Sequence, residues 1–93
     1  MRRILTLPSF ERSARKLTPL DKAQLAESLE QFNNFVLSGY APAGLGFKKI
    51  EPDIYEFRVG LRLRVVVLVE GDAYYLALIG SHNEVSRYLR RRR

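Results

Sequence analysis

The chain has 93 residues, which suits one small domain with a single modest core. Sixteen lysines and arginines against ten acidic residues give a formal charge of +6, and five of the arginines fall within residues 87–93. With no cysteine and one histidine, the chain excludes disulfides and thiolate metal sites and leaves little from which to build a zinc or copper site. We therefore expect no cofactor and no metal, with carboxylate-bound Mg²⁺ as the one option that composition leaves open.

The sequence gives no sign of a membrane segment. No run approaches the roughly 20 consecutive apolar residues that a membrane span requires. The first ten residues include two arginines but no long apolar stretch, so they are not typical of a signal peptide. We expect a cytoplasmic protein that does not bind membranes.

The chain begins with a predicted strand and a predicted short helix. Residues 3–7 alternate in part and predict a β-strand, which Pro8 ends. In residues 9–17, apolar side chains recur with the spacing i, i+4, i+7, which predicts an amphipathic helix.

A second, longer helix is predicted to follow. Thr18, Pro19 and Asp21 combine a capping hydroxyl, a proline at the first helical position and an acid three residues after the cap. The helix is expected to reach about Leu37, and residues 39–46, with three glycines and a proline, predict a loop. The helix carries a stripe of apolar residues suited to covering a sheet: Leu25, Leu29, Phe32 and Val36.

The remaining pattern is that of strands. Residues 47–50 predict a short strand, residues 51–53 a turn, and residues 54–59 an alternating strand. Residues 61–69 (LRLRVVVLV) and 74–80 (YYLALIG) predict a β-hairpin that turns at Gly71-Asp72.

A two-residue turn fixes the expected register of this hairpin. Glu70 then lies opposite Ala73, Arg64 opposite Ile79, and Arg62 opposite Ser81. One face is predicted to be apolar and to pack against helices, and it comprises Leu61, Leu63, Val65, Val67, Val69, Tyr74, Leu76 and Leu78.

The other face of the hairpin is divided along its length. Near the turn it is apolar, and we expect the C-terminal helix or a partner protein to cover this part, which comprises Val66, Leu68, Tyr75 and Ala77. Its far end carries Arg62 and Arg64 beside Gly80-Ser81-His82. Guanidinium groups next to the chain's only histidine indicate a candidate phosphate site.

The chain ends in a short predicted helix and a basic tail. Asn83 and Glu84 are expected to begin a final helical turn or two. For the tail, residues 87–93, we weigh a frayed and disordered terminus equally against a contact with nucleic acid or with an acidic protein.

Three motifs together resemble the RelE/ParE superfamily of bacterial toxins, which belong to type II toxin-antitoxin systems. They are IYEFRVG at residues 54–60, an arginine early in the next strand (Arg64), and GSHNEV at residues 80–85. The resemblance covers nearly the whole chain. It implies an α+β fold in one RelE-like domain, residues 1–93, with an antiparallel sheet of four to five strands, two N-terminal helices against it and a short C-terminal helix.

The resemblance also implies a function. Ribonuclease members of the superfamily bind the ribosome, cleave messenger RNA without a metal and so inhibit translation. A cognate antitoxin neutralises such a toxin in a hetero-oligomer. The alternative is a ParE-like toxin that inhibits DNA gyrase by binding and has no nuclease activity, and a third possibility is a plain nucleic-acid-binding module.

The resemblance assigns roles residue by residue. It implies catalytic roles for His82, Arg64, Arg58, Lys49 and Tyr88. We expect RNA-binding roles for four further basic residues: Lys48, Arg62, Arg87 and Arg90. The chain departs from the family pattern at Glu56, where some potent ribonucleases have lysine, and at Ser86, where a tyrosine is common.

The chemistry of RNA cleavage agrees with part of this assignment. Attack of a 2′-OH on the adjacent phosphate needs a proton acceptor, a proton donor for the leaving 5′-oxygen and cations near the phosphorane. Histidine suits the donor because imidazole titrates near neutrality, whereas arginine suits the cationic role and is a poor base. The chemistry leaves three candidates for the group that accepts the 2′-OH proton: Lys48, Lys49 and Glu56.

Overall fold

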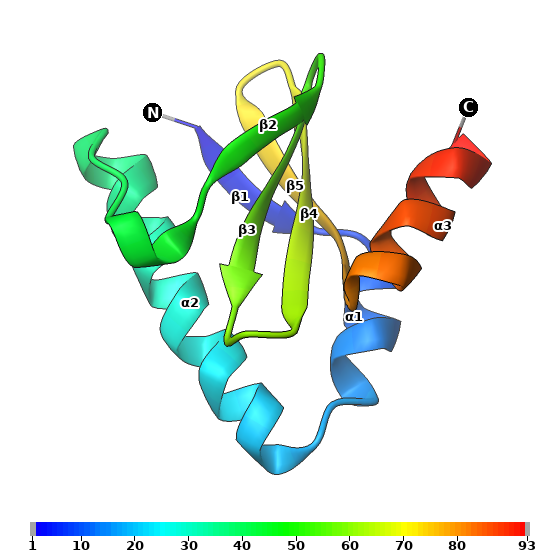
Figure 1. Ribbon diagram of the computed structural model, residues 1–93. Coiled ribbons are helices and arrows are strands. Elements are labelled where there is room, and N and C mark those ends of the chain that lie inside the picture. The colour runs from blue at the N-terminus through cyan, green and yellow to red at the C-terminus, as the bar shows by residue number, and fades with distance from the viewer. Residues whose placement is uncertain (1, 93) are drawn as a thin grey trace.

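The computed structural model describes residues 2–92, which form one five-stranded sheet with helices on both faces (Figure 1). The elements in chain order are β1 (Arg3–Thr6), α1 (Pro8–Arg15), α2 (Pro19–Ser38), the 3-10 turn η1 (Ala43–Leu45), β2 (Lys48–Glu51), β3 (Ile54–Val59), β4 (Leu63–Glu70), β5 (Ala73–Gly80) and α3 (His82–Arg92). The expected α+β fold is confirmed. No helix within residues 2–92 combines the length and apolar character that crossing a membrane requires.

The sheet is mixed rather than purely antiparallel. Its strand order is β1-β5-β4-β3-β2, and β1 runs parallel to β5 while the other neighbours are antiparallel. A hairpin can join only antiparallel strands, but β1 and β5 are separated by most of the chain, so nothing local fixes their relative direction. The expectation of an antiparallel sheet was therefore wrong at this one pair.

The local signals for the start and end of α2 are confirmed. The Thr18 hydroxyl accepts a hydrogen bond from the Asp21 backbone N–H at 3.1 Å, and Pro19 is the first residue of α2. Gly39 ends α2 with φ of 78°, a left-handed conformation that glycine adopts without strain. The predicted loop at residues 39–46 contains η1, and its Leu45 is fully buried.

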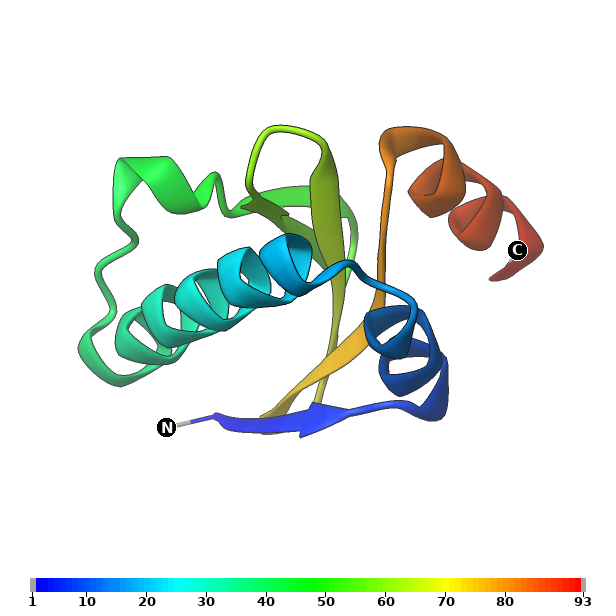
Figure 2. The ribbon, with the colours of Figure 1, turned by 90° about the horizontal axis from the view of Figure 1, so that it is seen from below.

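One face of the sheet packs against α1 and α2, and the other face packs against α3 (Figure 2). On one face Phe32 of α2 stacks on Phe57 of β3 with ring centroids 4.9 Å apart, and both side chains are fully buried. Burial of one such side chain contributes on the order of 2–3 kcal/mol. On the other face α3 covers Val66 and Ala77 with Val85, as expected for this apolar part of the hairpin.

A β-bulge corrects the expected hairpin register. Pairing follows the prediction from Glu70–Ala73 to Val67–Leu76, but Val66 then lies opposite Leu78 and Arg64 opposite Gly80. Ala77 is thus the extra residue, and the faces of β5 exchange beyond it. Ile79 joins the core that the sheet shares with α1 and α2, whereas Leu78, which we expected there, packs under α3.

The start of the hairpin also differs from the prediction. β4 begins at Leu63, so Arg62 has no partner at Ser81, and Leu61 is fully exposed instead of lying on the apolar face. Gly60 has a positive φ of 61° and turns the chain between β3 and β4. The apolar-basic alternation of residues 61–64 therefore belongs partly to a turn.

α1 lies beside the edge of β5 beyond the point where β1 ends. β1 pairs with β5 only as far as Leu76. Beyond that point the Ser9 hydroxyl donates to the Ala77 carbonyl at 2.5 Å, and the Ser13 hydroxyl accepts from the Ile79 N–H at 3.1 Å. These bonds satisfy backbone groups around the bulge and fix α1 beside β5.

The C-terminal helix is longer than the predicted turn or two. α3 comprises eleven residues, so residues 87–92 of the expected basic tail are helical, and Arg93 lies outside the described residues. Val85 is buried and Leu89 half-buried against the sheet. Tertiary packing therefore supports a helix that its arginine-rich composition did not indicate.

Candidate functional site

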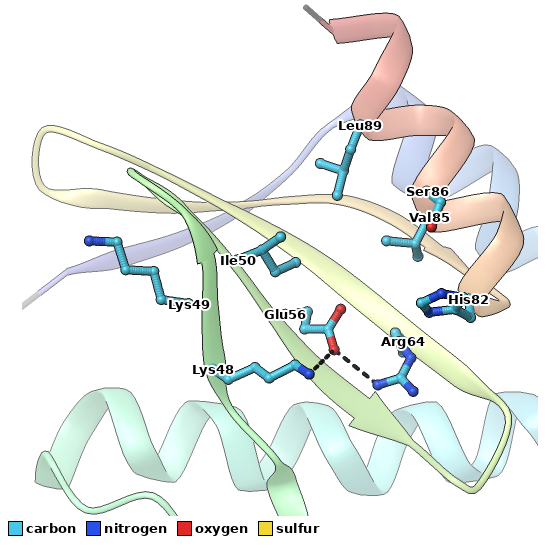
Figure 3. Close-up of a pocket in the computed structure, with 9 residues that line it drawn as sticks. All are labelled: Lys48, Lys49, Ile50, Glu56, Arg64, His82, Val85, Ser86 and Leu89. Atoms are coloured by element: carbon cyan, nitrogen blue, oxygen red, sulfur yellow. Dashed lines mark hydrogen bonds and ion pairs between the residues drawn. The ribbon is translucent and has the colours of Figure 1, made fainter.

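A pocket of about 290 Å³ lies between the α3 face of the sheet and the start of α3 (Figure 3). Residues from β2, β3, β4 and α3 line it: Lys48, Lys49, Ile50, Glu56, Arg64, His82, Val85, Ser86 and Leu89. The lining residues lie up to 41 positions apart in the sequence. The pocket brings together an acid, lysine and arginine cations and the chain's only histidine.

Glu56 lies at the centre of this pocket and forms ion pairs with two basic side chains. Its side chain is only 8% exposed, and its Oε2 atom accepts a hydrogen bond from Arg64 Nη1 at 2.9 Å. Lys48 Nζ lies 3.7 Å from the same oxygen. A buried carboxylate requires such partners, because an unpaired charge in the protein interior is costly.

The strand register explains why these side chains meet. Lys48 is the direct cross-strand partner of Glu56, and Glu56 is the partner of Val66 on β4. Arg64 is two residues from Val66 and is therefore the diagonal neighbour of Glu56 on the same face. The arrangement follows from the pairing of β2, β3 and β4.

A capping box positions His82 at the first residue of α3. The Ser81 backbone N–H donates to Glu84 Oε1 at 2.8 Å, and the Glu84 backbone N–H donates to Ser81 Oγ at 3.2 Å. A Cβ atom on Gly80 would lie 2.9 Å from the Glu84 Cβ, so the absence of a side chain there makes room for the box. Gly80, Ser81 and Glu84 of the GSHNEV motif thus form the turn. The exposed side chain of His82, between them in the sequence, lines the pocket.

The sequence contained the signal for this helix start. Ser81 and Glu84 have the S-x-x-E spacing of a capping box, which places the cap one residue before His82. Our prediction that Asn83 and Glu84 begin the helix was therefore one residue late.

Glu84 is the group whose protonation this turn perturbs. The hydrogen bond from the Ser81 backbone N–H lowers the pKa of Glu84 below its usual value, and burial partly opposes that effect. The Ser81 hydroxyl and the charges of Arg87 and Lys16 lower the pKa further. The carboxylate form therefore stabilises the start of α3.

Two of the predicted catalytic residues on the sheet are turned away from the pocket centre. Lys49 pairs with Tyr55 and directly follows Lys48, so the two lysine side chains leave β2 on opposite faces. The Lys49 ammonium points away from Glu56 in Figure 3. Arg58 is the cross-strand partner of Arg64. However, its side chain approaches Gly46 and lines a separate hollow with residues of α2.

The other predicted residues lie elsewhere on the molecule. Arg62 is 3.9 Å from Asp21 at the start of α2. Tyr88 faces α1 rather than the pocket, and Arg87 and Arg90 lie with Arg91 on another side of α3. Of the nine residues proposed for catalysis or RNA binding, the structure therefore places Lys48, Lys49, Arg64 and His82 at the pocket.

The pocket also includes residues for which we had predicted no role in a site. Ile50, Val85 and Leu89 supply an apolar wall, and Ser86 lies one turn after His82 on α3. Val85, Ser86 and Leu89 follow His82 at i+3, i+4 and i+7, a spacing that could have placed these three residues with His82 on one helix face. Within residues 2–92, no group of three or more histidine, cysteine or acidic side chains is arranged to hold a metal ion.

No protein-family model matches the sequence, and no curated protein matches it either. Solved structures do match. A chain of the RelB-RelE antitoxin-toxin complex from Methanococcus jannaschii is similar with a TM-score of 0.68 and 19% identity, over 90% of this chain and 96% of that chain.

Two further solved structures have the same fold. YafQ from E. coli has a TM-score of 0.64 and 10% identity, over 91% of this chain and 98% of that chain. A copper-bound mutant toxin from Helicobacter pylori has a TM-score of 0.66 and 18% identity, over 91% of this chain and 99% of that chain. This chain therefore has the fold of RelE- and YafQ-type toxins, as the sequence motifs predicted.

Proposed function

We propose that this chain, with its RelE-type fold, is the toxin of a type II toxin-antitoxin system and a metal-independent endoribonuclease. Its substrate is messenger RNA on the ribosome, and a cognate antitoxin neutralises it. The observation that carries the proposal is the pocket in which Lys48, Glu56 and Arg64 meet His82. The antitoxin-toxin complex among the similar structures supports the partner.

Lys48 and Arg64 bind the scissile phosphate in this proposal. Both cations already contact one carboxylate oxygen, Glu56 Oε2, so they converge on a single anionic atom. A phosphate oxygen that enters the pocket meets the same two donors, and Arg64 suits bidentate contact with it. The cations then stabilise the charge that builds on the phosphorane.

Glu56 is the proposed base. The Lys49 ammonium points away from the pocket centre, and Lys48 is paired with Glu56, which leaves the Glu56 carboxylate as the candidate acceptor at the pocket centre. The Glu56 carboxylate takes the proton of the 2′-OH as the 2′-oxygen attacks phosphorus. The phosphate takes the place of Glu56 Oε2 as the partner of Lys48 and Arg64, so this carboxylate oxygen becomes available to the 2′-OH.

His82 is the proposed acid. The bond between phosphorus and the 5′-oxygen breaks, and protonated His82 delivers its proton to that oxygen. The products are a 2′,3′-cyclic phosphate and a free 5′-OH. The two proton transfers balance each other, and the proposed reaction uses no metal ion. His82 is exposed at the first residue of α3, where its imidazole can reach a bound RNA strand.

Induction of this chain in a bacterium tests the proposed function. We expect growth to stop because protein synthesis stops, and co-expression of the antitoxin encoded beside the toxin gene should restore both. Nothing in the similar structures supports the gyrase alternative. If DNA gyrase supercoiling fails in the arrested cells while messenger RNA stays intact, that alternative replaces our proposal; if growth continues at verified expression, the toxin assignment is wrong.

A further inference from the structure

A second groove, of about 480 Å³, lies on the other side of α3 from the pocket. One wall is a stripe of α1 and the other a stripe of α3, and both helices pack on β5. On α3 the residues at i, i+4 and i+7 from Glu84 face this α1–α3 groove. His82, Val85 and Ser86 instead line the pocket, so α3 separates two distinct surfaces.

The rim of the groove is basic. Arg12 on α1, Lys16 at the C-cap of α1 and Arg91 on α3 are all exposed, and we call these three residues the basic rim. Among the described lining residues Glu84 is the single acid, and the Ser81 backbone N–H already engages its carboxylate. The groove therefore favours an anionic occupant.

The floor of the groove is apolar and incompletely covered. Leu17, Leu78 and Tyr88 line it, each is only half-buried, and we call them the apolar floor. Leu78 is there because the bulge at Ala77 turns it to this face. Leu17 and Leu78 offer no hydrogen-bond donor to RNA phosphates, whereas leucine or valine side chains of a peptide would bury apolar surface against them.

We propose that the α1–α3 groove binds an acidic, amphipathic segment of a partner protein. Apolar residues of that segment fill the apolar floor, and its carboxylates pair with the basic rim. The identification of this partner as the antitoxin rests on the proposed function. The evidence for the groove and for the chemistry of its occupant is independent of that function. The segment would be anchored beside the pocket that binds RNA, not inside it.

Fluorescence anisotropy with synthetic probes tests this inference. The first probe is a labelled 14-residue peptide with leucines at i, i+3, i+4 and i+7 and glutamates at most other positions. The second has the same glutamates but asparagine in place of each leucine, and the third is a single-stranded oligouridylate. We expect the full-length chain to bind the first probe at least about tenfold more tightly than the second, because the floor discriminates between them.

Charge reversal locates the binding. The double variant Arg12→Glu with Lys16→Glu should weaken binding of the first probe at least about tenfold. Lys22→Glu, which makes the same kind of charge change at an exposed position of α2, should not change it. Amide shifts on titration of isotope-labelled protein should concentrate in residues 9–17 and 78–91.

Several outcomes would overturn the inference. They are equal affinity for the leucine and asparagine peptides, preference for the oligouridylate, shifts centred on Lys48 and Glu56, or no saturable binding up to about 1 mM. The binding assay contains no messenger RNA or ribosome. A chain that binds the leucine peptide but cleaves nothing would therefore disprove the proposed nuclease and leave the groove intact.

Discussion

The Glu56 carboxylate holds two cations at one oxygen, and its charge should matter more for cleavage than for folding. In Glu56→Gln the amide oxygen still accepts a hydrogen bond from Arg64, so we expect a loss of about 1 kcal/mol in the free energy of unfolding. Cleavage of ribosome-bound messenger RNA should fall by about 10²-fold or more, since the base is lost. Glu70→Gln, an exposed residue at the end of β4, is the control. Cleavage by Glu56→Gln at the wild-type rate would remove Glu56 from the mechanism.

Glu84 makes the stability of the chain depend on pH in a predictable direction. Its folded-state pKa is lowered from 4.5, so the carboxylate contributes stability that is fully present above pH 4.5 and is lost as the pH falls through the lowered pKa. Glu84→Gln keeps an acceptor for the Ser81 N–H but does not titrate. Urea unfolding should show wild type more stable than this variant at pH 7, with the difference shrinking below pH 4.5. A difference that is the same at pH 7 and pH 3 would contradict the assignment.

At the scale of elements, the start of α3 depends on the absence of a side chain at Gly80. In Gly80→Ala the new methyl would lie 2.9 Å from the Glu84 Cβ, so the capping box must shift and His82 with it. We expect a loss of about 1–3 kcal/mol in the free energy of unfolding and faster amide exchange in α3. Gly44→Ala is the matched control, because a Cβ there meets nothing within 4 Å. Equal stability of the two variants would show that the box tolerates the methyl.

The elements that the sequence predicted well are those with local signals. Thr18 and Pro19 begin α2, and the turn at Gly71-Asp72 fixes the first pairs of the hairpin, because each signal acts within a few residues. The bulge at Ala77 was not predictable in this way. Leu78 and Ile79 are both aliphatic, so exchanging their faces leaves the hydrophobic pattern unchanged. The parallel pairing of β1 with β5 is likewise set by distant packing.

At the scale of the whole molecule, the candidate site depends on how distant segments meet. The sequence singled out Arg64 and His82 correctly as neighbours, because one lies early in β4 and the other directly after β5. It assigned catalysis to Lys49 and RNA binding to Lys48, but the pairing of β2 with β3 puts Lys48, not Lys49, against Glu56. Arg58 shares a face with Arg64 but extends toward Gly46, a contact that only the folded chain reveals.

The most direct test of the account is the cleavage of ribosome-bound messenger RNA by His82→Ala, followed by primer extension and analysis of the RNA ends. Wild type should cut and leave 2′,3′-cyclic phosphates, and Asn83→Ala, which changes the next exposed residue of α3, should cut equally well. His82→Ala should cut about 10²-fold more slowly or worse, with unchanged thermal stability, because it lacks the proton donor. If His82→Ala cuts at the wild-type rate, or if wild type leaves no cyclic phosphate, the pocket does not cleave RNA by the proposed chemistry.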